Sequence, residues 1–574
     1  MKRRLMIGMR KDERGVALVL TIFISVVLLI FGSVFVLRAV NEKLTSERER
    51  YGVQAFYLAE AASEMAIHKI DELINTDMLS TVNITNPQTV GNKANQFVGN
   101  GDGVGFLIQF VKKGSTPQLS LVGTDGKYVQ GATNLGNGSY QYDVYISEKS
   151  NPVMVATDIW EFPFYYRAQA SATVKSIQKK IILTGDFTVR VQRDNFARYA
   201  LFTDHHSLPN GTTVWFTDKT DFAGPIHTNE RFSFALNPSG TFDGVSTQHH
   251  NQARFYNNGS PILLDAAANG TTDVPVFNAS YTRGVNEIVL ASSVQKADLA
   301  NQAKGGQNIS TDGIHVPNNG SNLTGGIYVQ GDSTVQMGVD AGDNAIYTIT
   351  QGATTQKITV DIPTNQTTVE TVGGGTQTYA GLPNGVDELG TIIYVNGYVN
   401  SLKGTVQKDT EVTVSAENDV VITDNILYSD YTPASGTPGA PGYIPPSAED
   451  KKNLFGVVAW GGDIRVATSA PDNVNIHGIM MARNGEFQVD DYDDQGVGSR
   501  GTATLLGGAI TQFYGAFGLF NGSTGQSVSG YGRNFLYDQR TMMGKAPPYF
   551  PSMKTFIAFT NDITDKMAWE ERHF

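Results

Sequence analysis

The sequence predicts an α+β protein in which a long N-terminal helix precedes a small antiparallel sheet and a large mostly-β domain. An uncharged apolar run is followed by a charged stretch with helical spacing, and short β-prone runs fill most of the remaining chain. The 61 glycines among 574 residues favour turns over helices in that remainder. We expect the large domain to be β-helix-like or solenoid-like, with a β-sandwich as the alternative.

The helix begins with an apolar run from Val16 to Leu37 that contains no charged residue. A helix over this run is about 33 Å long, which is enough to cross a hydrocarbon core of roughly 30 Å. A cleaved secretory signal is the alternative, but its apolar core is usually about 7 to 15 residues long and ends at a small-residue site. This run is longer and ends at Leu37-Arg38. We therefore expect one membrane span.

Charge is unevenly distributed along the chain. Residues 1–15 carry a net +4, so the other 559 residues carry −16 within the total of −12. A basic segment before an apolar span stays in the cytoplasm. We expect a cytoplasmic leader over 1–15, a single-pass anchor in the inner membrane, and a periplasmic or extracellular ectodomain. The acidic ectodomain argues against nucleic acid as a partner, because phosphate binding requires clustered Lys and Arg.

The stretch after the span is expected to continue the helix to residue 75. It contains no Pro, and its apolar side chains recur at steps of three and four residues: Tyr51, Ala55, Leu58, Ala62 and Met65. Glu, Lys and Arg cover the opposite face, so we expect a helix over 16–75 that is half in lipid and half amphipathic. This helix packs either on its own domain alone or also among related helices in a filament, and the spacing does not separate these alternatives.

Two motifs in this region carry a family resemblance. Glu13-Arg14-Gly15-Val16-Ala17-Leu18-Val19 leads into the span, and Ala55-Phe56-Tyr57-Leu58-Ala59-Glu60-Ala61-Ala62 follows it. Together they resemble the N-terminus of PilX-type minor pilins and of K-type minor pseudopilins of type II secretion. The resemblance implies a prepilin peptidase that cuts after Gly15 and leaves Val16 as the first residue. It also implies other pilin or pseudopilin subunits as partners of the helix.

One position departs from the major pilins of this family. They carry Glu at the fifth mature position, where Leu20 stands here. A carboxylate at that depth needs a partner in the membrane, so its absence implies that this subunit does not have to dock beneath another. K-type pseudopilins share the absence and cap their filament, and the resemblance therefore implies a tip position. The rival interpretation is an uncleaved anchor that never joins a filament.

Residues 76–195 predict a pilin-like α+β domain. Three runs are rich in aromatics or alternate apolar and polar residues, as half-buried strands do: 139–147, 162–173 and 177–191. Three strands after a long helix fit a unit in which the helix packs on an antiparallel sheet.

Residues 196–560 are interpreted as one β-rich, solenoid-like domain. Similar apolar triplets begin near Gly326, Thr391 and Gly456, about 65 residues apart, which is too long for one coil of a solenoid. The loop 431–446 is rich in Pro and Gly, so we expect an extended surface insertion there. Residues 561–574 are expected to form a C-terminal tail.

A second resemblance lies within this β-rich region. It rests on Tyr531 and four segments: Ala200-Leu201-Phe202-Thr203, Gly224-Pro225-Ile226-His227-Thr228-Asn229, Tyr537-Asp538-Gln539-Arg540 and Pro547-Pro548-Tyr549-Phe550-Pro551. They resemble an uncharacterised domain found behind PilX-type N-termini in large bacterial envelope proteins. That family has no assigned enzymatic activity that carries over to this chain.

Candidate metal sites are few. Cys is absent, which excludes disulfides, thiolate zinc sites and cysteine nucleophiles. Histidines occur near His206, His227 and His250 without an HExxH spacing, and we expect His227 to hydrogen-bond a turn backbone. The remaining candidates for a metal are four carboxylates in a row that suit Ca²⁺ but lack the EF-hand spacing: Asp490, Asp491, Asp493 and Asp494. A solvated loop is the alternative there.

Enzymatic groups are equally sparse. A carbohydrate-degrading β-helix needs paired carboxylates on one face, and Asp490, Asp493 and Arg500 are the best group available. We expect no enzymatic activity, no metal and no cofactor. Asp332 and Asp463 each follow Gly and are expected in turns.

The sequence therefore predicts a minor pilin or pseudopilin-like component of a type IV pilus or related system. It would be anchored in the lipid bilayer and would display a β domain for assembly or adhesion. A permanently anchored envelope protein is the first alternative, and a carbohydrate-binding or carbohydrate-degrading β-helix protein is the second.

Overall fold

The structure is a computed structural model of the 574-residue chain. It describes residues 13–73 and 129–572, with short gaps at 137, 151–152, 157–158, 218–219, 236–239, 258–259, 265–274, 437–440, 522–525, 543 and 561–567. The chain forms two compact units, one from residues 1–191 with 557–574 and one from residues 192–556. The second unit is thus an insertion within the sequence of the first, and each is described by itself below.

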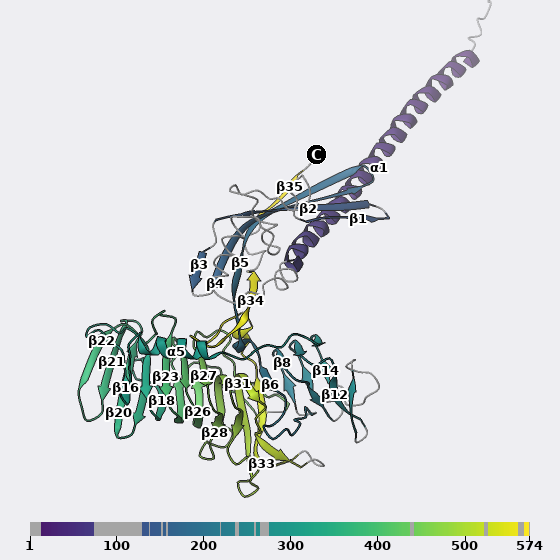
Figure 1. The fold of residues 1–574 in the computed structure, drawn as a ribbon. Coiled ribbons are helices and arrows are strands. Elements are labelled where there is room, and N and C mark those ends of the chain that lie inside the picture. The colour runs from purple at the N-terminus through teal and green to yellow at the C-terminus, as the bar shows by residue number, and fades with distance from the viewer. Residues whose placement is uncertain are drawn as a thin grey trace, which may run out of the picture. The chain divides into compact units, whose positions relative to one another are not determined.

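The first unit begins with the helix α1, Glu13–Leu73, which is 61 residues long and continues through Gly52 (Figure 1). The expectation of a long N-terminal helix is confirmed, as is the α+β class. Within the described residues, α1 is the one helix that is long and apolar enough to cross a membrane. It fits single-pass membrane anchoring.

The second half of α1 packs on the sheet of the first unit through small side chains. Four alanines at steps of four, three and four residues are completely buried: Ala55, Ala59, Ala62 and Ala66. Met65, expected on the same stripe, is instead exposed. The face that packs on the sheet is centred on the four alanines, and Met65 lies beside it. Helix and sheet approach closely there, because a Cβ atom at Gly138 of the sheet would lie 3.0 Å from the Leu58 Cδ1 atom.

That sheet has seven strands in the order β1-β2-β4-β5-β34, with β3 beside β4 and β35 beside β5. The predicted strands at 139–147, 162–173 and 177–191 fall within β2, β4 and β5. Residues 568–572, expected in a tail, form β35, which pairs antiparallel with β5. The bounds are β1 Val129–Leu135, β2 Gly138–Glu148, β3 Val153–Ala156, β4 Ile159–Val174, β5 Ile177–Asn195, β34 Ser552–Thr560 and β35 Ala568–Arg572.

The second unit is built on a long ladder of parallel strands, here called the first ladder. Each strand pairs in parallel with the next in the spatial order given. Its members are β17 Ile327–Gln330, β23 Thr391–Asn396, β25 Glu411–Ala416, β27 Leu454–Ala459, β29 Asn475–Ala482, β31 Ser499–Phe513, β6 Leu201–His205, β8 Ile226–Thr228, β11 Ser246–Gln248 and β15 Tyr281–Arg283.

A second ladder, also parallel, runs beside part of the first. The chain therefore alternates between the ladders in successive coils: Thr391 pairs with Val412 and Gly456 with Ile479, which are 21 and 23 residues apart. The members of the second ladder are β18 Ser333–Val339, β24 Val399–Val406, β26 Val420–Tyr428, β28 Ile464–Val466 and β30 Phe487–Val489.

The order of strands in the first ladder differs from their order in the sequence. β6, the first of these strands in the sequence, lies beside β31, the last of them, in the middle of the ladder (Figure 1). The ladder strands that follow β6 in the sequence lie progressively farther from β31, as far as β15 at one end of the ladder. The next ladder strand in the sequence, β17, lies at the other end, and the strands after it lead back to β31.

Several smaller elements complete this unit. A four-strand antiparallel insertion, β19–β22, follows β18, and β16 pairs antiparallel with β17. The bounds are η2 Phe196–Arg198, β7 Asp221–Phe222, β9 Ser233–Phe234, β10 Thr241–Phe242, β12 Ala253–Asn257, β13 Ser260–Leu264, β14 Val276–Phe277, α5 Ser293–Lys304, β16 Gly313–His315, β19 Ala345–Gln351, β20 Thr354–Asp361, β21 Gln366–Thr371, β22 Thr376–Ala380, β32 Gly518–Phe520, β33 Ser527–Leu536 and η3 Gln539–Thr541.

Several strands of the first ladder, such as β23 and β27, are buried on both faces. In β23, Ile393 and Val395 join the inner core, whereas Ile392 and Tyr394 join a second core on the outer face. Helix α5 contributes Leu299 to that outer core. Burial on both faces explains why these strands read in the sequence as continuous apolar runs rather than as alternating patterns.

Glycines and aspartates shape the corners of the coils. Gly507 has φ +153°, and a Cβ atom there would lie 2.0 Å from the Gly478 carbonyl oxygen of the neighbouring coil. The expected turns at Asp332 and Asp463 are present. Asp332 Oδ1 accepts a hydrogen bond from a backbone N–H one coil away at 2.9 Å, and Asp463 Oδ1 does the same at 2.9 Å.

Candidate functional site

The apolar half of α1 is the first candidate region. Val16, Leu20 and Leu37 are 72%, 57% and 62% exposed. The polar groups within the span are satisfied locally, because Thr21 Oγ1 donates to the Ala17 carbonyl and Ser33 Oγ to the Ile30 carbonyl, both at 2.7 Å. This surface is thus apolar with internally bonded polar groups, as a lipid environment requires. Gly15 lies in the first turns of α1, and residues 1–12 of the leader lie outside the described residues.

The histidine motif of the second unit is structural. His227 is completely buried, and burial lowers its pKa to about 4. Its Nδ1 lies 2.8 Å from Thr247 Oγ1 and its Nε2 lies 2.9 Å from Asn229 Oδ1. The expectation of a backbone partner was wrong: both partners are side chains. The neutral imidazole fixes Asn229, which in turn exchanges two hydrogen bonds with the Ile288 backbone at 2.8 and 2.9 Å.

Those bonds anchor one of two segments that cover the outer face of the first ladder. The first covering segment, residues 285–305, ends in α5. It receives a hydrogen bond from Arg483 Nε to the Ala291 carbonyl at 2.9 Å and pairs Lys296 with Glu417 at 2.7 Å. These contacts reach different coils, so the segment ties together strands that are far apart in the sequence.

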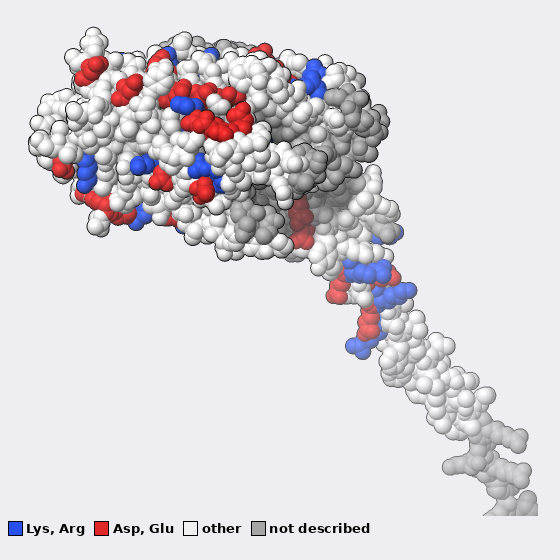
Figure 2. All heavy atoms as spheres, turned by 90° about the horizontal axis from the view of Figure 1, so that it is seen from below, with Lys and Arg blue, Asp and Glu red and all other residues white. Residues whose placement is uncertain are grey.

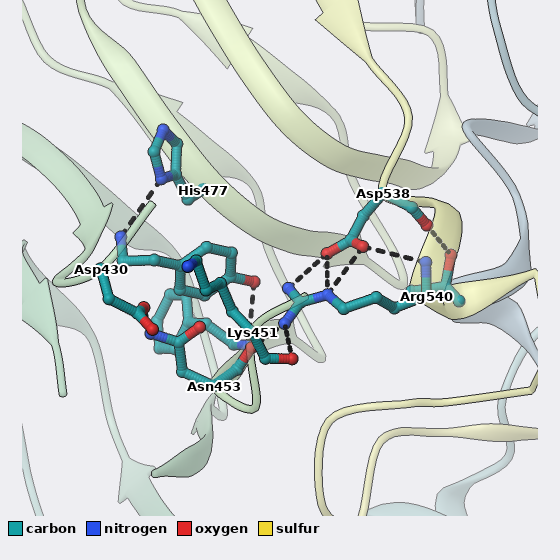
Figure 3. Close-up of polar contacts among 9 residues, drawn as sticks. Asp430, Lys451, Asn453, His477, Asp538 and Arg540 are labelled. Carbon is teal, nitrogen blue, oxygen red and sulfur yellow. Dashed lines mark hydrogen bonds and ion pairs between the residues drawn. The ribbon is translucent and has the colours of Figure 1, made fainter. Parts of the chain in front are cut away.

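The second covering segment, residues 537–553, contains the Tyr-Asp-Gln-Arg motif. The Asp538 carboxylate accepts hydrogen bonds from Arg540 Nε at 2.9 Å and Nη2 at 2.6 Å, and their side chains are only 2% and 5% exposed (Figure 3). Arg540 Nη1 also donates to the carbonyls of Lys451 and Asn453. The buried, bidentate ion pair thus holds Arg540 in place, and the Nη1 bonds of Arg540 join this segment to the residues just before β27.

The surroundings of this ion pair are also buried. The Arg540 guanidinium lies 5.1 Å from the centre of the Tyr428 ring, and the Tyr428 hydroxyl accepts a hydrogen bond from the Phe455 N–H at 3.2 Å. His477 Nδ1 accepts from the Tyr428 N–H at 3.1 Å, and burial lowers the His477 pKa to about 3 (Figure 3). The cluster is packed and densely hydrogen-bonded, although His477 Nε2 and Asn453 Oδ1 are buried without a partner among the described residues. Its burial and internal bonds indicate a structural clamp between coils.

Figure 2 shows acidic side chains clustered on one face, with a basic side chain among them. Within the described residues, the four carboxylates that the sequence proposed for Ca²⁺ do not form a metal site. Asp490 pairs with Arg465 at 3.0 Å, and Asp494 Oδ1 accepts the Gly496 N–H at 2.7 Å. Asp491 and Asp493 are exposed. Across the described ranges, no three His, Asp or Glu side chains come together as they would around a metal ion.

The sequence had also grouped Arg500 with Asp490 and Asp493 as a candidate for carbohydrate chemistry. Arg500 Nε instead donates to Asp472 at 3.2 Å, and its Nη1 donates to the Ala467 carbonyl at 3.3 Å. Arg500 thus contacts the turn before β29, whereas Asp490 pairs with Arg465, so the two side chains have separate partners.

Sequence reasoning missed a pocket of about 460 Å³ at the end of the second unit that carries the β19–β22 insertion. Its lining comes from residues 307–318 and from one face of β20–β22. The alternation in Thr367, Val369 and Thr371 was the available signal, since it places these side chains on one face of a half-buried hairpin.

Comparisons with known proteins add three findings. Residues 161–248 match the family described as a domain of unknown function, DUF4900. No curated protein matches the chain. The crystal structure of the competence-associated pilin ComZ from Thermus thermophilus is similar at 10% identity and a TM-score of 0.27, covering 91% of this chain and 98% of that one. A TM-score this low does not establish a shared fold.

Proposed function

We propose that this chain is a non-enzymatic minor pilin or pseudopilin-like subunit of a type IV pilus or related filament system. The observation that carries the proposal is the division of α1 into an apolar, uncovered half and a half that packs on its own sheet through four alanines. The uncovered half needs lipid or other helices around it. A subunit that waits in the lipid bilayer and then packs among related helices uses both environments.

The details of this role follow from the residues at the start of α1. We propose that residues 1–15 stay in the cytoplasm, that prepilin peptidase cuts between Gly15 and Val16, and that the two folded units lie outside the cytoplasmic membrane. Leu20 supplies no carboxylate for a subunit docked next to it, which favours a tip or accessory position. The parallel ladders support the interpretation of the second unit as a β-helix that is displayed for assembly or adhesion.

Mass spectrometry of the N-terminus tests the processing step. We expect protein isolated from its native cells to begin at Val16 and the variant Gly15→Val to keep residues 1–15, because a β-branched side chain would block the junction. Native protein that still begins at Met1 would contradict the proposal and favour a permanent anchor.

Site-specific crosslinking tests the partners, and the absence of Cys makes each introduced thiol unique. A photo-crosslinker on Val19→Cys, in the exposed half, should give adducts with other subunits in the sheared filament fraction. The same crosslinker on Ala62→Cys, buried on the sheet, should give none. Filaments without adducts from Val19→Cys would remove the assembly role.

A further inference from the structure

The pocket next to the β19–β22 insertion is built from two walls. One wall is the face of the hairpin strands on which Gln356 pairs with Thr371, and Val369 with Gln377, across neighbouring strands. The other wall is the segment 307–318, which includes β16. β16 and β20–β22 gather at the same end of the second unit (Figure 1).

The hairpin wall changes character along its length. Near its root, Ile358 and Thr367 are fully buried and Tyr379 nearly so. Further out the same face carries Gln356, Thr371 and Gln377, which are partly or fully exposed. The pocket itself combines aliphatic side chains, among them Val369 on this face, with amides and a hydroxyl. Its volume is typical of small-molecule sites, roughly 300 to 1,000 Å³.

The lining contains no Lys, Arg, Asp or Glu. Phosphates and carboxylates need a cationic partner and ammonium groups need an anionic one, so this lining fits an uncharged ligand. Four of the lining residues are amides, which both donate and accept hydrogen bonds: Gln307, Asn318, Gln356 and Gln377. Aliphatic side chains stand between them at Ile314, Val316 and Val369.

Individual polar atoms in the pocket are available to a ligand. Gln356 Oε1 is buried and has no hydrogen-bond partner among the described residues. The Tyr379 hydroxyl donates to Gln377 Oε1, which leaves the Gln377 amide nitrogen to donate elsewhere. His315 Nε2 lies 2.9 Å from the Thr311 carbonyl, so in the neutral ring Nε2 carries the proton and Nδ1 is an acceptor.

We propose that this pocket binds an uncharged carbohydrate, with amides pairing to its hydroxyls and the aliphatic wall packing on its C–H face. A sugar presents both kinds of surface at once, with hydroxyls that donate and accept around a ring of C–H groups. The inference rests on the proposed display function, for which it names the class of ligand.

The test is a printed array of neutral and acidic oligosaccharides probed with the fluorescently labelled full chain in detergent micelles. Neutral glycans that bind are then titrated as free sugars. We expect the affinity for them to fall at least tenfold in Gln377→Ala and in Gln356→Ala. The matched controls Thr378→Ala and Lys357→Ala lie on the opposite face of the same strands and should bind as wild type. Circular dichroism checks that each variant is folded.

Three outcomes would overturn the inference: no glycan retained, only acidic glycans retained, or neutral glycans retained equally by wild type and both Gln variants. None of these outcomes bears on processing at Gly15. Failure of carbohydrate binding is thereby distinguishable from failure of the pilin-like role.

Discussion

Replacing Arg540 with Met should destabilise the second unit more than any substitution of an exposed charge. The methionine keeps much of the apolar stem but removes both guanidinium donors to Asp538, whose side chain is 2% exposed. Asp538 keeps only the backbone N–H of residue 540, at 3.1 Å. The carbonyls of Lys451 and Asn453 lose their donor as well. Removing one partner of a buried ion pair costs about 3 to 5 kcal/mol, because the remaining charge stays buried without compensation.

Urea unfolding of the full chain in detergent micelles measures this loss. The fluorescence of Trp460, which is buried and donates to Ser415 Oγ at 2.9 Å, reports on the second unit when the other three tryptophans are changed to Phe. We expect the unfolding midpoint of Arg540→Met to fall steeply. The double variant with Asp538→Asn should recover part of the loss, because it no longer buries a charge.

The control is Lys452→Met, which removes an exposed ion pair to Asp409 at 3.3 Å. Exposed pairs contribute about 0 to 1 kcal/mol. If Arg540→Met loses no more than Lys452→Met, the Asp538–Arg540 pair is not the clamp that its burial indicates.

Three further predictions concern packing, backbone conformation and pH. Gly507→Ala should lower the free energy of unfolding by about 2 kcal/mol or more, because φ is +153° and the new Cβ would lie 2.0 Å from a carbonyl oxygen. The control Gly498→Ala, which has open space around it, should cost about 1 kcal/mol or less. Thermal unfolding measures both. Ala59→Leu should destabilise the first unit by about 1 to 3 kcal/mol through overpacking. Ala61→Leu, on the exposed face, should leave its stability unchanged. Limited proteolysis of the first unit compares the two variants. Burial lowers the pKa of His206 to about 3 from 6.5, so the unfolded chain binds its proton first and stability is lost as pH falls from 6.5 toward 3. Both ring nitrogens of His206 are buried without a partner among the described residues, so His206→Phe should raise the denaturation midpoint and flatten that acid loss; an unchanged pH profile would contradict this account.

The sequence was sufficient for the elements whose signals are local. The apolar run and the alanine-rich motif predicted α1, and the aromatic and alternating runs predicted β2, β4 and β5. It was insufficient at Met65, because helical spacing alone does not show which side of a broad apolar stripe the sheet covers. The length of one coil could not be read from the sequence either. The spacing from residue 391 to residue 456 covers two coils, and the second of them contains the 431–446 loop. The ends of that loop pair through Thr432 with Ser447 and Ser435 with Ile444.

For the candidate sites, too, the sequence showed local motifs but not the contacts that these motifs make with distant residues. The Tyr-Asp-Gln-Arg motif was visible, but its role depends on Asn453 and Lys451, which lie almost ninety residues earlier in the chain. The position of β6 beside β31 depends on pairing across about three hundred residues and has no local signature. The pocket arises where an insertion meets a loop, so neither segment alone predicts it. The processing junction at Gly15 stays a prediction.

The place where the chain enters and leaves the second unit has a mechanical consequence. The chain enters at Gln192 on β5 and leaves at Phe556 on β34, and these two strands are neighbours in one sheet. Both ends of the first ladder are therefore internal bends of the chain, and neither offers a free terminus from which traction could peel off coils. A pull along the paired strands would load the middle of the ladder, where β6 and β31 adjoin. Tensile strength in this unit should thus depend on that central junction more than on the coils at either end.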